Sequence, residues 1–302
     1  MASNYHRPVM LKECIEGLAI KPDGVYVDLT FGGGGHSKEI LKVLKSGHLY
    51  GFDQDVDAKA NAEEINESSF TFVEANFRFL KRYLKMYGVT QVDGILGDLG
   101  ISSHQIDEES RGFSTRYDAE LDMRMDQAAD KTAKDVVNSY NQDELHKILG
   151  MYGEVRNART LAAAIVAERV NNPINTTEDL KNVLKKFAKR GKENRYYAQV
   201  FQAIRIEVNE ELKVLEEVME QCAEVLKPGG RLVVMSYHSL EDRIVKNIIN
   251  KGSAEGKVEK DFYGNVLKPF KAVNKKPIEA QPEEIELNNR ARSAKLRIAE
   301  KI

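Results

Sequence analysis

Long apolar runs are absent from this sequence, and their absence excludes a membrane-spanning helix. No stretch of about 18 uncharged apolar residues occurs, which is roughly the length that a helix needs to cross a bilayer. The N-terminal sequence MASNYHRPVMLKECIEGL also lacks the long apolar core of a secretion signal. With 42% hydrophobic and 30% charged residues, the composition is that of a globular protein, and we expect it in the cytoplasm.

Cysteine is scarce, because Cys14 and Cys222 are the only two. They lie far apart in amphipathic segments, so we expect two reduced thiols rather than a disulfide. Neither they nor the six scattered histidines fall at the spacing of metal ligands. The sequence therefore predicts no metal site.

A strong net charge is also missing, since the formal value is −2, and this excludes a globally basic nucleic-acid binder. The charge is unevenly distributed, however. Residues 181–195 hold seven lysines and arginines against one acid, whereas residues 105–130 hold eight acids against three arginines. A local basic stretch of this kind suits phosphate binding or a solvated helix face equally well.

The first hundred residues alternate short strand-like runs with helical segments. We expect strands at 24–29, 48–53, 70–74 and 91–99, with helices at 37–45, at 58–65 and through 80–84 between them. Such alternation predicts parallel βαβ units with right-handed crossovers.

After Ser103 the alternation stops. Residues 107–130 are irregular and charged, and helices are then predicted at 142–151, 157–170, 177–189 and 196–225. A turn at 227–230, a strand at 231–236, a helix at 240–250 and a last strand at 293–299 follow. We therefore predict one α/β domain made of 1–106 and 210–302, interrupted by a mainly helical insertion at 107–209 that recognises the substrate.

A run of four glycines follows the first predicted strand, which ends in Asp28. Glycines let a backbone turn sharply and approach a ligand, and the helix that follows offers N–H groups to it. The pattern begins like the dinucleotide fingerprint, but Ser37 stands where that fingerprint needs glycine or alanine. Asp28 would also repel a pyrophosphate, so Asp28 and Gly33 fit the loop of an S-adenosylmethionine enzyme better.

Two further acids end predicted strands. Asp53 lies 18 residues after Gly35, where a carboxylate can accept hydrogen bonds from the hydroxyls of a cofactor ribose. Asp98 ends the fourth strand, where enzymes that methylate exocyclic amines place a hydrogen-bond acceptor beside the amine. His238 follows the strand at 231–236 and is a second catalytic candidate, with a structural, hydrogen-bonded histidine as the alternative.

Eight segments together resemble one family, the bacterial 16S rRNA cytosine-N4 methyltransferases also known as MraW. The segments span nearly the whole chain: Asn4–Met10, Phe31–Ser37, Asp98–Ser103 with Arg111–Ser114, Leu121–Asp126, Phe201–Ile206, Ser236–Arg243 and Asn289–Ser293. Three residues depart from the family's pattern, namely His104 for proline, Tyr237 for phenylalanine and Asn289 for proline.

The resemblance implies a Rossmann-like class I methyltransferase core with an inserted helical domain. It implies methyl transfer from S-adenosyl-L-methionine to N4 of a cytidine in the decoding centre of 16S rRNA, near the P site. By position it implies that the cofactor contacts, beyond Asp28 and Gly33, are Gly34, Gly35, His36, Asp53, Phe77, Asp98 and Gln105.

RNA is the expected partner, within the small ribosomal subunit, and we expect neither a membrane nor DNA; a homodimer is possible. The candidate phosphate contacts are Arg111, Arg124, Lys186, Lys189, Arg190, Arg205, Arg290 and Arg292. For each one alone, a solvated surface side chain is an equal alternative. Two other functions stay open at this point: an amino methyltransferase of DNA or adenine, and an inactive RNA-binding assembly factor that keeps the fold.

Overall fold

The structure, a computed structural model, describes residues 8–302. Residues 4–7, which begin the first family-like segment, lie outside the described residues. The chain forms two compact units, one of residues 1–100 with 212–302 and the other of residues 101–211. Each is described by itself below. Across residues 8–302, no helix has both the length and the apolar character that a bilayer span requires.

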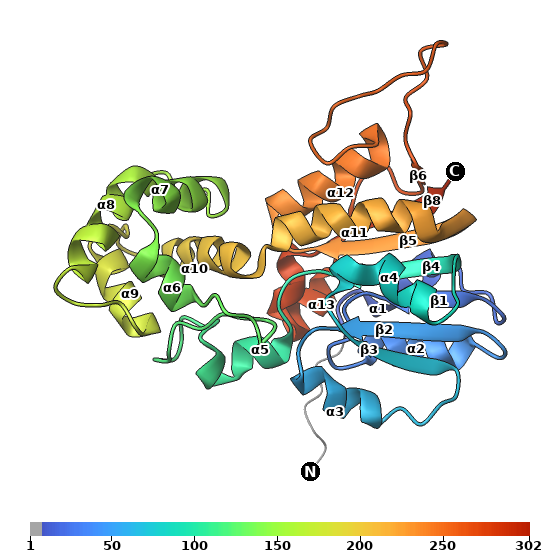
Figure 1. The fold of residues 1–302 in the computed structure, drawn as a ribbon, viewed down its shortest axis with the longest axis horizontal. Helices are drawn as coiled ribbons and strands as arrows, with labels where there is room; N and C mark the ends of the chain where they lie inside the picture. The colour runs from blue at the N-terminus through green and yellow to red at the C-terminus, as the bar shows by residue number, and fades with distance from the viewer. Residues whose placement is uncertain (1–7) are drawn as a thin grey trace. The chain divides into compact units, whose positions relative to one another are not determined.

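Unit 1 is built on an eight-stranded sheet with the order β3-β2-β1-β4-β5-β8-β6, and β7 also pairs with β8 (Figure 1). The first five strands in that order are parallel, whereas β8 runs antiparallel to its neighbours. The strands are β1 (Val25–Asp28), β2 (His48–Asp53), β3 (Phe70–Glu74), β4 (Val92–Asp98), β5 (Leu226–Ser236), β6 (Phe270–Ala272), β7 (Ile278–Glu279) and β8 (Lys295–Lys301). All six predicted strands are therefore confirmed, and β6 and β7 are additional.

Both faces of this sheet are covered, which explains why its strands are nearly continuous apolar runs. Alternate side chains of a strand point to opposite faces. Tyr26 and Leu96 pack with α1 and α2, whereas Val27 and Ile95 pack with α4, α11 and α12. The helices of unit 1 are α1 (Leu11–Leu18), α2 (Gly35–Val43), α3 (Asp57–Glu63), η1 (Phe77–Phe79), α4 (Leu80–Met86), α11 (Glu211–Val225, from Leu212 on), α12 (Ser239–Lys251), α13 (Pro282–Leu287) and η3 (Asn289–Ser293).

The strand order creates a switch point beside β1. From β1 the chain proceeds outward to β2 and β3, and then returns to β4 on the other side of β1. In open α/β sheets, ligands bind at the carboxyl ends of the strands where the order reverses. Asp28 and Asp98 end the two strands at this point.

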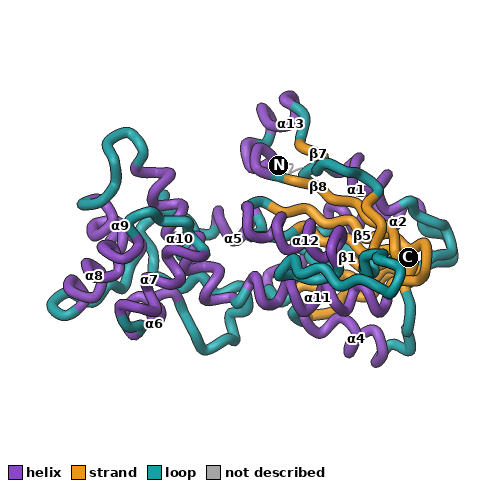
Figure 2. The backbone as a smooth tube through the Cα atoms, turned by 90° about the horizontal axis from the view of Figure 1, so that it is seen from above, coloured by secondary structure: helices purple, strands orange, loops and turns teal. Residues whose placement is uncertain are grey.

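Unit 2 is helical, and Figure 2 shows the sheet strands, in orange, confined to unit 1. Its elements are α5 (Ser103–Asp107), η2 (Glu109–Arg111), α6 (Ala133–Ser139), α7 (Gln142–Met151), α8 (Ala158–Arg169), α9 (Thr177–Lys185) and α10 (Glu193–Asn209). Their apolar faces form a core of their own, in which Leu121, Leu161 and Val200 are fully buried. Leu121 and Met123 belong to the irregular segment 107–130, so that segment is packed although it is not helical.

Two sequence expectations need correction. The helix predicted at 196–225 is two helices, because Glu210 takes a left-handed backbone conformation with φ of 51° and ends α10. The turn predicted at 227–230 lies within β5, whose register against β4 shifts between Val92 and Gly94. The four residues bulge out there, so the strand begins earlier than the composition indicates.

The left-handed backbone conformation at the end of α1 can be tested by mutation. Ala19 caps this helix with φ of 47°, a conformation that costs a residue with a Cβ about 1–2 kcal/mol. We expect Ala19→Gly to raise the free energy of unfolding by about 1 kcal/mol, measured by urea denaturation. Ala60→Gly, at an exposed position inside α3, is the control and should lower it by about 1 kcal/mol. Equal effects of the two changes would contradict the strain at Ala19.

Candidate active site

The carboxylate of Asp28 is buried, with 1% of the residue exposed. It accepts hydrogen bonds from the Ser37 hydroxyl at 2.7 Å and from the Thr30 backbone N–H at 3.1 Å. Burial raises its pKa, while these donors and His36 oppose the rise. Asp28 therefore joins the end of β1 to the first turn of α2 and does not face solvent, which revises its predicted role from cofactor contact to support of the loop.

The glycine loop has a shape that only glycine adopts readily at two positions. Gly32 and Gly34 have φ of 51° and 72°. The Asn61 amide donates to the Gly32 carbonyl at 3.1 Å and fixes the loop from α3. At Gly35 a Cβ would lie 2.2 Å from Pro8 Cγ, so no larger residue fits.

Gly33 is the exposed residue at the tip of this loop. Directly after it, α2 begins at Gly35, and the first N–H groups of a helix have no acceptor within that helix. The His36 ring is buried and lies 3.1 Å from the Val9 carbonyl through Nε2, so only its backbone belongs to the ligand-facing turn.

Asp53 ends β2 beside the loop. Its Oδ2 accepts from the Gly32 backbone N–H at 2.7 Å and its Oδ1 from the Asp55 N–H at 2.9 Å. Each carboxylate oxygen has two lone pairs, so the residue keeps acceptor capacity for two hydroxyls. Burial raises the pKa of Asp53 to about 6, and the negative charges of Asp55 and Asp28 add to this rise.

Phe77 follows β3 in the short helix η1. The Asn76 side chain accepts from the Arg78 N–H at 2.8 Å and donates to Gln54 Oε1 at 2.6 Å, which positions this segment next to the residue after Asp53. Phe77 is half-buried against the core of unit 1. Its ring thus lies at the same sheet edge as the loop.

Asp98 ends β4 and is held by two neighbours. The Thr30 hydroxyl accepts from the Asp98 backbone N–H at 2.7 Å, and the Tyr237 hydroxyl donates to Asp98 Oδ1 at 2.8 Å. No described residue donates to Oδ2. Burial raises the pKa of Asp98 to about 6, the Asp28 charge adds to the rise, and His36 and the Tyr237 bond oppose it.

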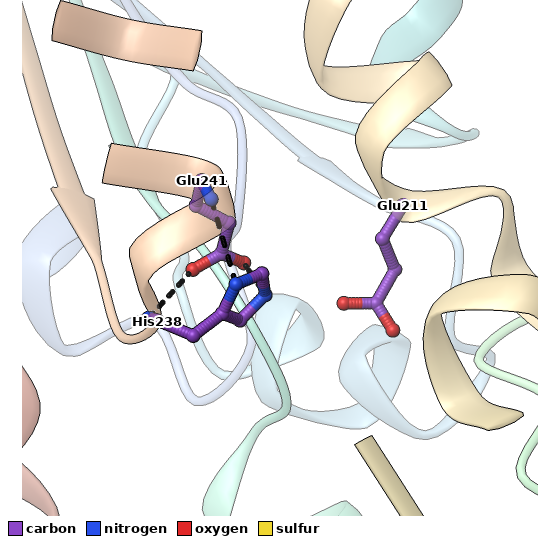
Figure 3. Close-up of side chains that lie close together, drawn as sticks. All are labelled: Glu211, His238 and Glu241. Carbon is purple, nitrogen blue, oxygen red and sulfur yellow. Dashed lines mark hydrogen bonds and ion pairs between the residues drawn. The ribbon is translucent and has the colours of Figure 1, made fainter. Parts of the chain in front are cut away.

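His238 serves as the N-cap of α12. Its Nδ1 accepts from the Glu241 N–H at 3.4 Å, and its Nε2 lies 3.3 Å from Glu241 Oε1 (Figure 3). The Glu241 carboxylate in turn accepts from the His238 backbone N–H. The capping box uses Nδ1 of the imidazole and accounts for the position of the ring, as the structural alternative expects. A catalytic role of His238 stays a prediction.

Unit 2 contains seven of the predicted site residues, and four of them are buried or half-buried with internal partners. Gln105 is buried and forms a capping box with Ser102 at the start of α5. Arg111 is buried and donates to the carbonyls of Arg124 and Met125.

Arg124 and Arg205 are held in the same way. Arg124 forms a bidentate pair with Asp122 and also donates to two carbonyls, and Arg205 forms a bidentate pair with Glu211. Arg111, Arg124 and Arg205 thus brace the fold of unit 2 through internal partners, and their role as phosphate contacts stays a prediction.

The other predicted cations are more accessible. Lys186, Lys189 and Arg190 are exposed at the end of α9 and after it, although Lys186 also pairs with Glu168 at 3.0 Å. In unit 1, Arg292 is exposed and Arg290 is half-buried. These five remain candidates for contact with phosphates.

Sequence reasoning missed the supports of the site. Ser37 signalled only that the dinucleotide fingerprint fails, whereas its hydroxyl is a main donor to Asp28. Thr30 gave no signal, and Tyr237 stood out only as a departure from the family's phenylalanine, not as a partner of Asp98. A polar residue at the third glycine position, nine residues after a buried acid, is the signal that points to such a contact.

A parallel α/β sheet with a glycine loop after its first strand, an acid ending the second and an acid ending the fourth defines an S-adenosylmethionine-dependent methyltransferase. The chain belongs to the MraW methylase family, which matches residues 3–302. The family resemblance and the fold class predicted from the sequence are thereby confirmed.

The similar curated proteins share one name, ribosomal RNA small subunit methyltransferase H. The protein from Cytophaga hutchinsonii is 64% identical over 98% of this chain and 99% of its own length. The protein from Christiangramia forsetii is 57% identical over 99% of this chain and 98% of its own. A solved rRNA methylase from Streptococcus thermophilus aligns over 97% of this chain and 93% of its own with 11% identity and a TM-score of 0.41.

We expect Ser37→Ala to destabilise the loop, because it leaves the buried Asp28 carboxylate without its shortest hydrogen bond. The free energy of unfolding should fall by about 1–3 kcal/mol, measured by thermal and urea denaturation. In an Asp28→Asn background the same change should cost clearly less, since the charge is gone. An equal cost in both backgrounds would show that Ser37 acts independently of Asp28.

The pH dependence of the reaction tests the Asp98–Tyr237 bond. A carboxylate acceptor with a pKa of about 6 loses its function as the pH falls through 6. Tyr237→Phe removes a donor that favours the ionised form, so the acid limb of kcat/KM should move to higher pH. Tyr83→Phe, which changes a tyrosine packed against Phe52, is the control and should leave the limb in place. An unmoved limb in Tyr237→Phe would mean that this bond does not tune Asp98.

Proposed function

We propose that this chain transfers a methyl group from S-adenosylmethionine to the exocyclic N4 of a cytidine in 16S rRNA, at the decoding centre near the P site. The observation that carries the chemistry is Asp98, whose Oδ1 is occupied by Tyr237 and whose Oδ2 receives no donor from the described residues. The name shared by the similar proteins supports the small-subunit rRNA as the substrate.

The donor set at the sheet edge fits the cofactor. When bound, S-adenosylmethionine supplies an electrophilic methyl group on a positively charged sulfur. The buried charge of Asp28, together with Asp98, favours a cation at this edge and opposes a pyrophosphate. Asp53 would accept from the ribose hydroxyls, Phe77 would hold the adenine, and the backbone of Gly33, Gly34, Gly35 and His36 would hold the methionine end.

Asp98 prepares the nucleophile. The lone pair of an exocyclic amine is delocalised into the cytosine ring, which makes the nitrogen weakly nucleophilic. An N–H of the amine that donates to Asp98 Oδ2 allows the nitrogen to pyramidalise and to direct its lone pair away from the ring. As the N4–methyl bond forms and the sulfur–methyl bond breaks, the sulfur keeps the bonding electrons and N4 acquires a positive charge. One amine proton then leaves toward Asp98 or water.

Each unit offers cations that are suited to phosphates by charge. They are the exposed Lys186, Lys189 and Arg190 in unit 2, and the exposed Arg292 with the half-buried Arg290 in unit 1. Such a substrate places the protein in the cytoplasm, with neither DNA nor a membrane as a partner. A homodimer stays a prediction.

Nucleoside mass spectrometry tests the proposed function. The chain is incubated with S-adenosylmethionine and either naked 16S rRNA or 30S subunits, and the RNA is digested to nucleosides. We expect N4-methylcytidine, at one equivalent per RNA in the better substrate. Label in adenine or in DNA alone would support an amino methyltransferase of another specificity. Tight RNA binding without any label would support an inactive assembly factor.

Asp98→Ala separates catalysis from cofactor binding. The change removes the acceptor for the amine, so turnover should fall by about 10²–10⁴-fold. Cofactor affinity, measured by calorimetry, should stay within about tenfold, because the ribose contact at Asp53 remains. Asp53→Ala is the matched comparison and should weaken the cofactor first. Equal losses of affinity and turnover in Asp98→Ala would place Asp98 among the cofactor ligands instead.

A further inference from the structure

An arm of unit 1, residues 252–269, joins α12 to β6 and extends away from the sheet and its helices (Figure 1). Its base is firmly attached. The Asn247 amide donates to the Ala254 carbonyl at 2.9 Å, and the Ile302 N–H donates to the Pro269 carbonyl at 3.0 Å. Phe270, which follows the arm, is fully buried. The arm therefore starts and ends on the core.

The tip of the arm is held in one conformation by its own hydrogen bonds. Lys260 and Val266 form an antiparallel bridge, and the Asp261 N–H donates to the Asn265 carbonyl at 2.9 Å. The Asp261 carboxylate accepts from the N–H groups of Tyr263 and Asn265 and from the Asn265 amide. Gly264 closes the turn with φ of 86°. Such a turn presents the side chains of its central residues in a fixed direction.

Those central residues are both aromatic. Phe262 and Tyr263 are 97% and 86% exposed, and their ring centroids lie 5.7 Å apart at an interplanar angle of 87°. Phe52 and Phe270, in contrast, are fully buried. Two adjacent rings held in water by a well-formed turn do not contribute to the core, which indicates a surface that binds something.

The pairing of charges on the arm leaves cations available for RNA. Two of its three acids are engaged, since Glu255 pairs with Lys257 and Asp261 is bonded within the turn, and the third, Glu259, is exposed. Within residues 8–302, Lys260, Lys268 and Lys271 form no ion pair. Aromatic faces beside unpaired cations are the combination by which proteins bind unpaired nucleotides, with bases on the rings and phosphates on the cations.

We propose that this arm binds an unpaired stretch of RNA, whose bases stack on Phe262 and Tyr263 and whose phosphates contact Lys260, Lys268 and Lys271. The choice of RNA as the ligand rests on the proposed function. The arm adds a contact outside the Asp98 site, so it acts on affinity for RNA and not on the chemistry of methyl transfer.

A fluorescent reporter tests the stacking directly, because the chain contains no tryptophan. Phe262→Trp introduces a single one at the tip. Without methyl donor, single-stranded oligouridine should quench its emission, and a duplex RNA of equal length should quench it much less. Met151→Trp, at a position in unit 2 that is 56% exposed and lies outside the proposed RNA contacts, is the control and should not respond. Absence of quenching with oligouridine and with 16S rRNA would overturn the proposal.

Affinity measurements distinguish stacking from apolar docking. The double change Phe262→Ala with Tyr263→Ala should weaken binding of 16S rRNA by about tenfold to a hundredfold. Phe262→Leu, which keeps an apolar side chain without a ring, should weaken it as well, whereas Phe262→Tyr should not. Lys260→Gln should lower the slope of the logarithm of the binding constant against the logarithm of the salt concentration by about one. Full affinity in Phe262→Leu would contradict stacking.

Three further outcomes separate this proposal from its alternatives and from the function on which it rests. If the double variant binds naked rRNA normally but binds 30S particles weakly, the arm docks on a ribosomal protein and the RNA proposal is wrong. If oligouridine quenches the reporter but no methylated cytidine forms, the proposed function fails while the arm stands. If methylation occurs but quenching and affinity are unaffected, the arm proposal fails alone.

Discussion

The buried carboxylate of Asp28 is the constraint on which the geometry of the site depends. A charge placed among apolar strands is unfavourable unless it is hydrogen-bonded, and the available donors are Ser37 and Thr30. These hydrogen bonds to Asp28 bring the start of α2 close to the end of β1. The glycines between them then have to turn sharply, which explains the left-handed backbone at Gly32 and Gly34.

The hydrogen bonding of Asp28 also affects the positions of Asp53 and Asp98. Thr30, held by Asp28, accepts the backbone N–H of Asp98 and so fixes the end of β4 to the loop. Gly32, within the loop, donates to Asp53 and fixes the end of β2. Three strand ends are thereby tied to one segment of about ten residues. The negative charge that results also raises the pKa of Asp53 and Asp98 beyond the effect of burial.

The sequence was sufficient for the regular part of the fold. The strands of a parallel sheet are buried on both faces, so each is a short apolar run, and each site acid marks the end of one. The break at Glu210 could not be predicted, because a glutamate within NEELK is an ordinary helical residue and only its backbone conformation ends α10. The short β6 and β7 were missed because they depend on pairing with β8 rather than on a pattern of their own.

The sequence predicted the position of the site acids better than the contacts of the arginines, for a physical reason. Sequence position shows which acids end strands, but residue type does not show what a long cation contacts. Arg111 and Arg205 have the same composition cues as Arg292, yet internal carbonyls and a carboxylate hold the first two. A guanidinium has five donors and is readily used to brace a loop. Exposure, rather than charge, separates the two groups.

Tyr237 shows how one departure from the family's pattern changes the chemistry of the site. With phenylalanine at this position, burial and the charge of Asp28 would act on Asp98 without the phenol that opposes them. A carboxyl with a pKa of about 6 is still roughly nine-tenths ionised at neutral pH, whereas each further unit of increase reduces the acceptor form substantially. The hydroxyl also occupies Oδ1, which under the proposed function leaves Oδ2 for the amine. Tyr237 thus favours the ionised form of Asp98 and limits which of its oxygens is open.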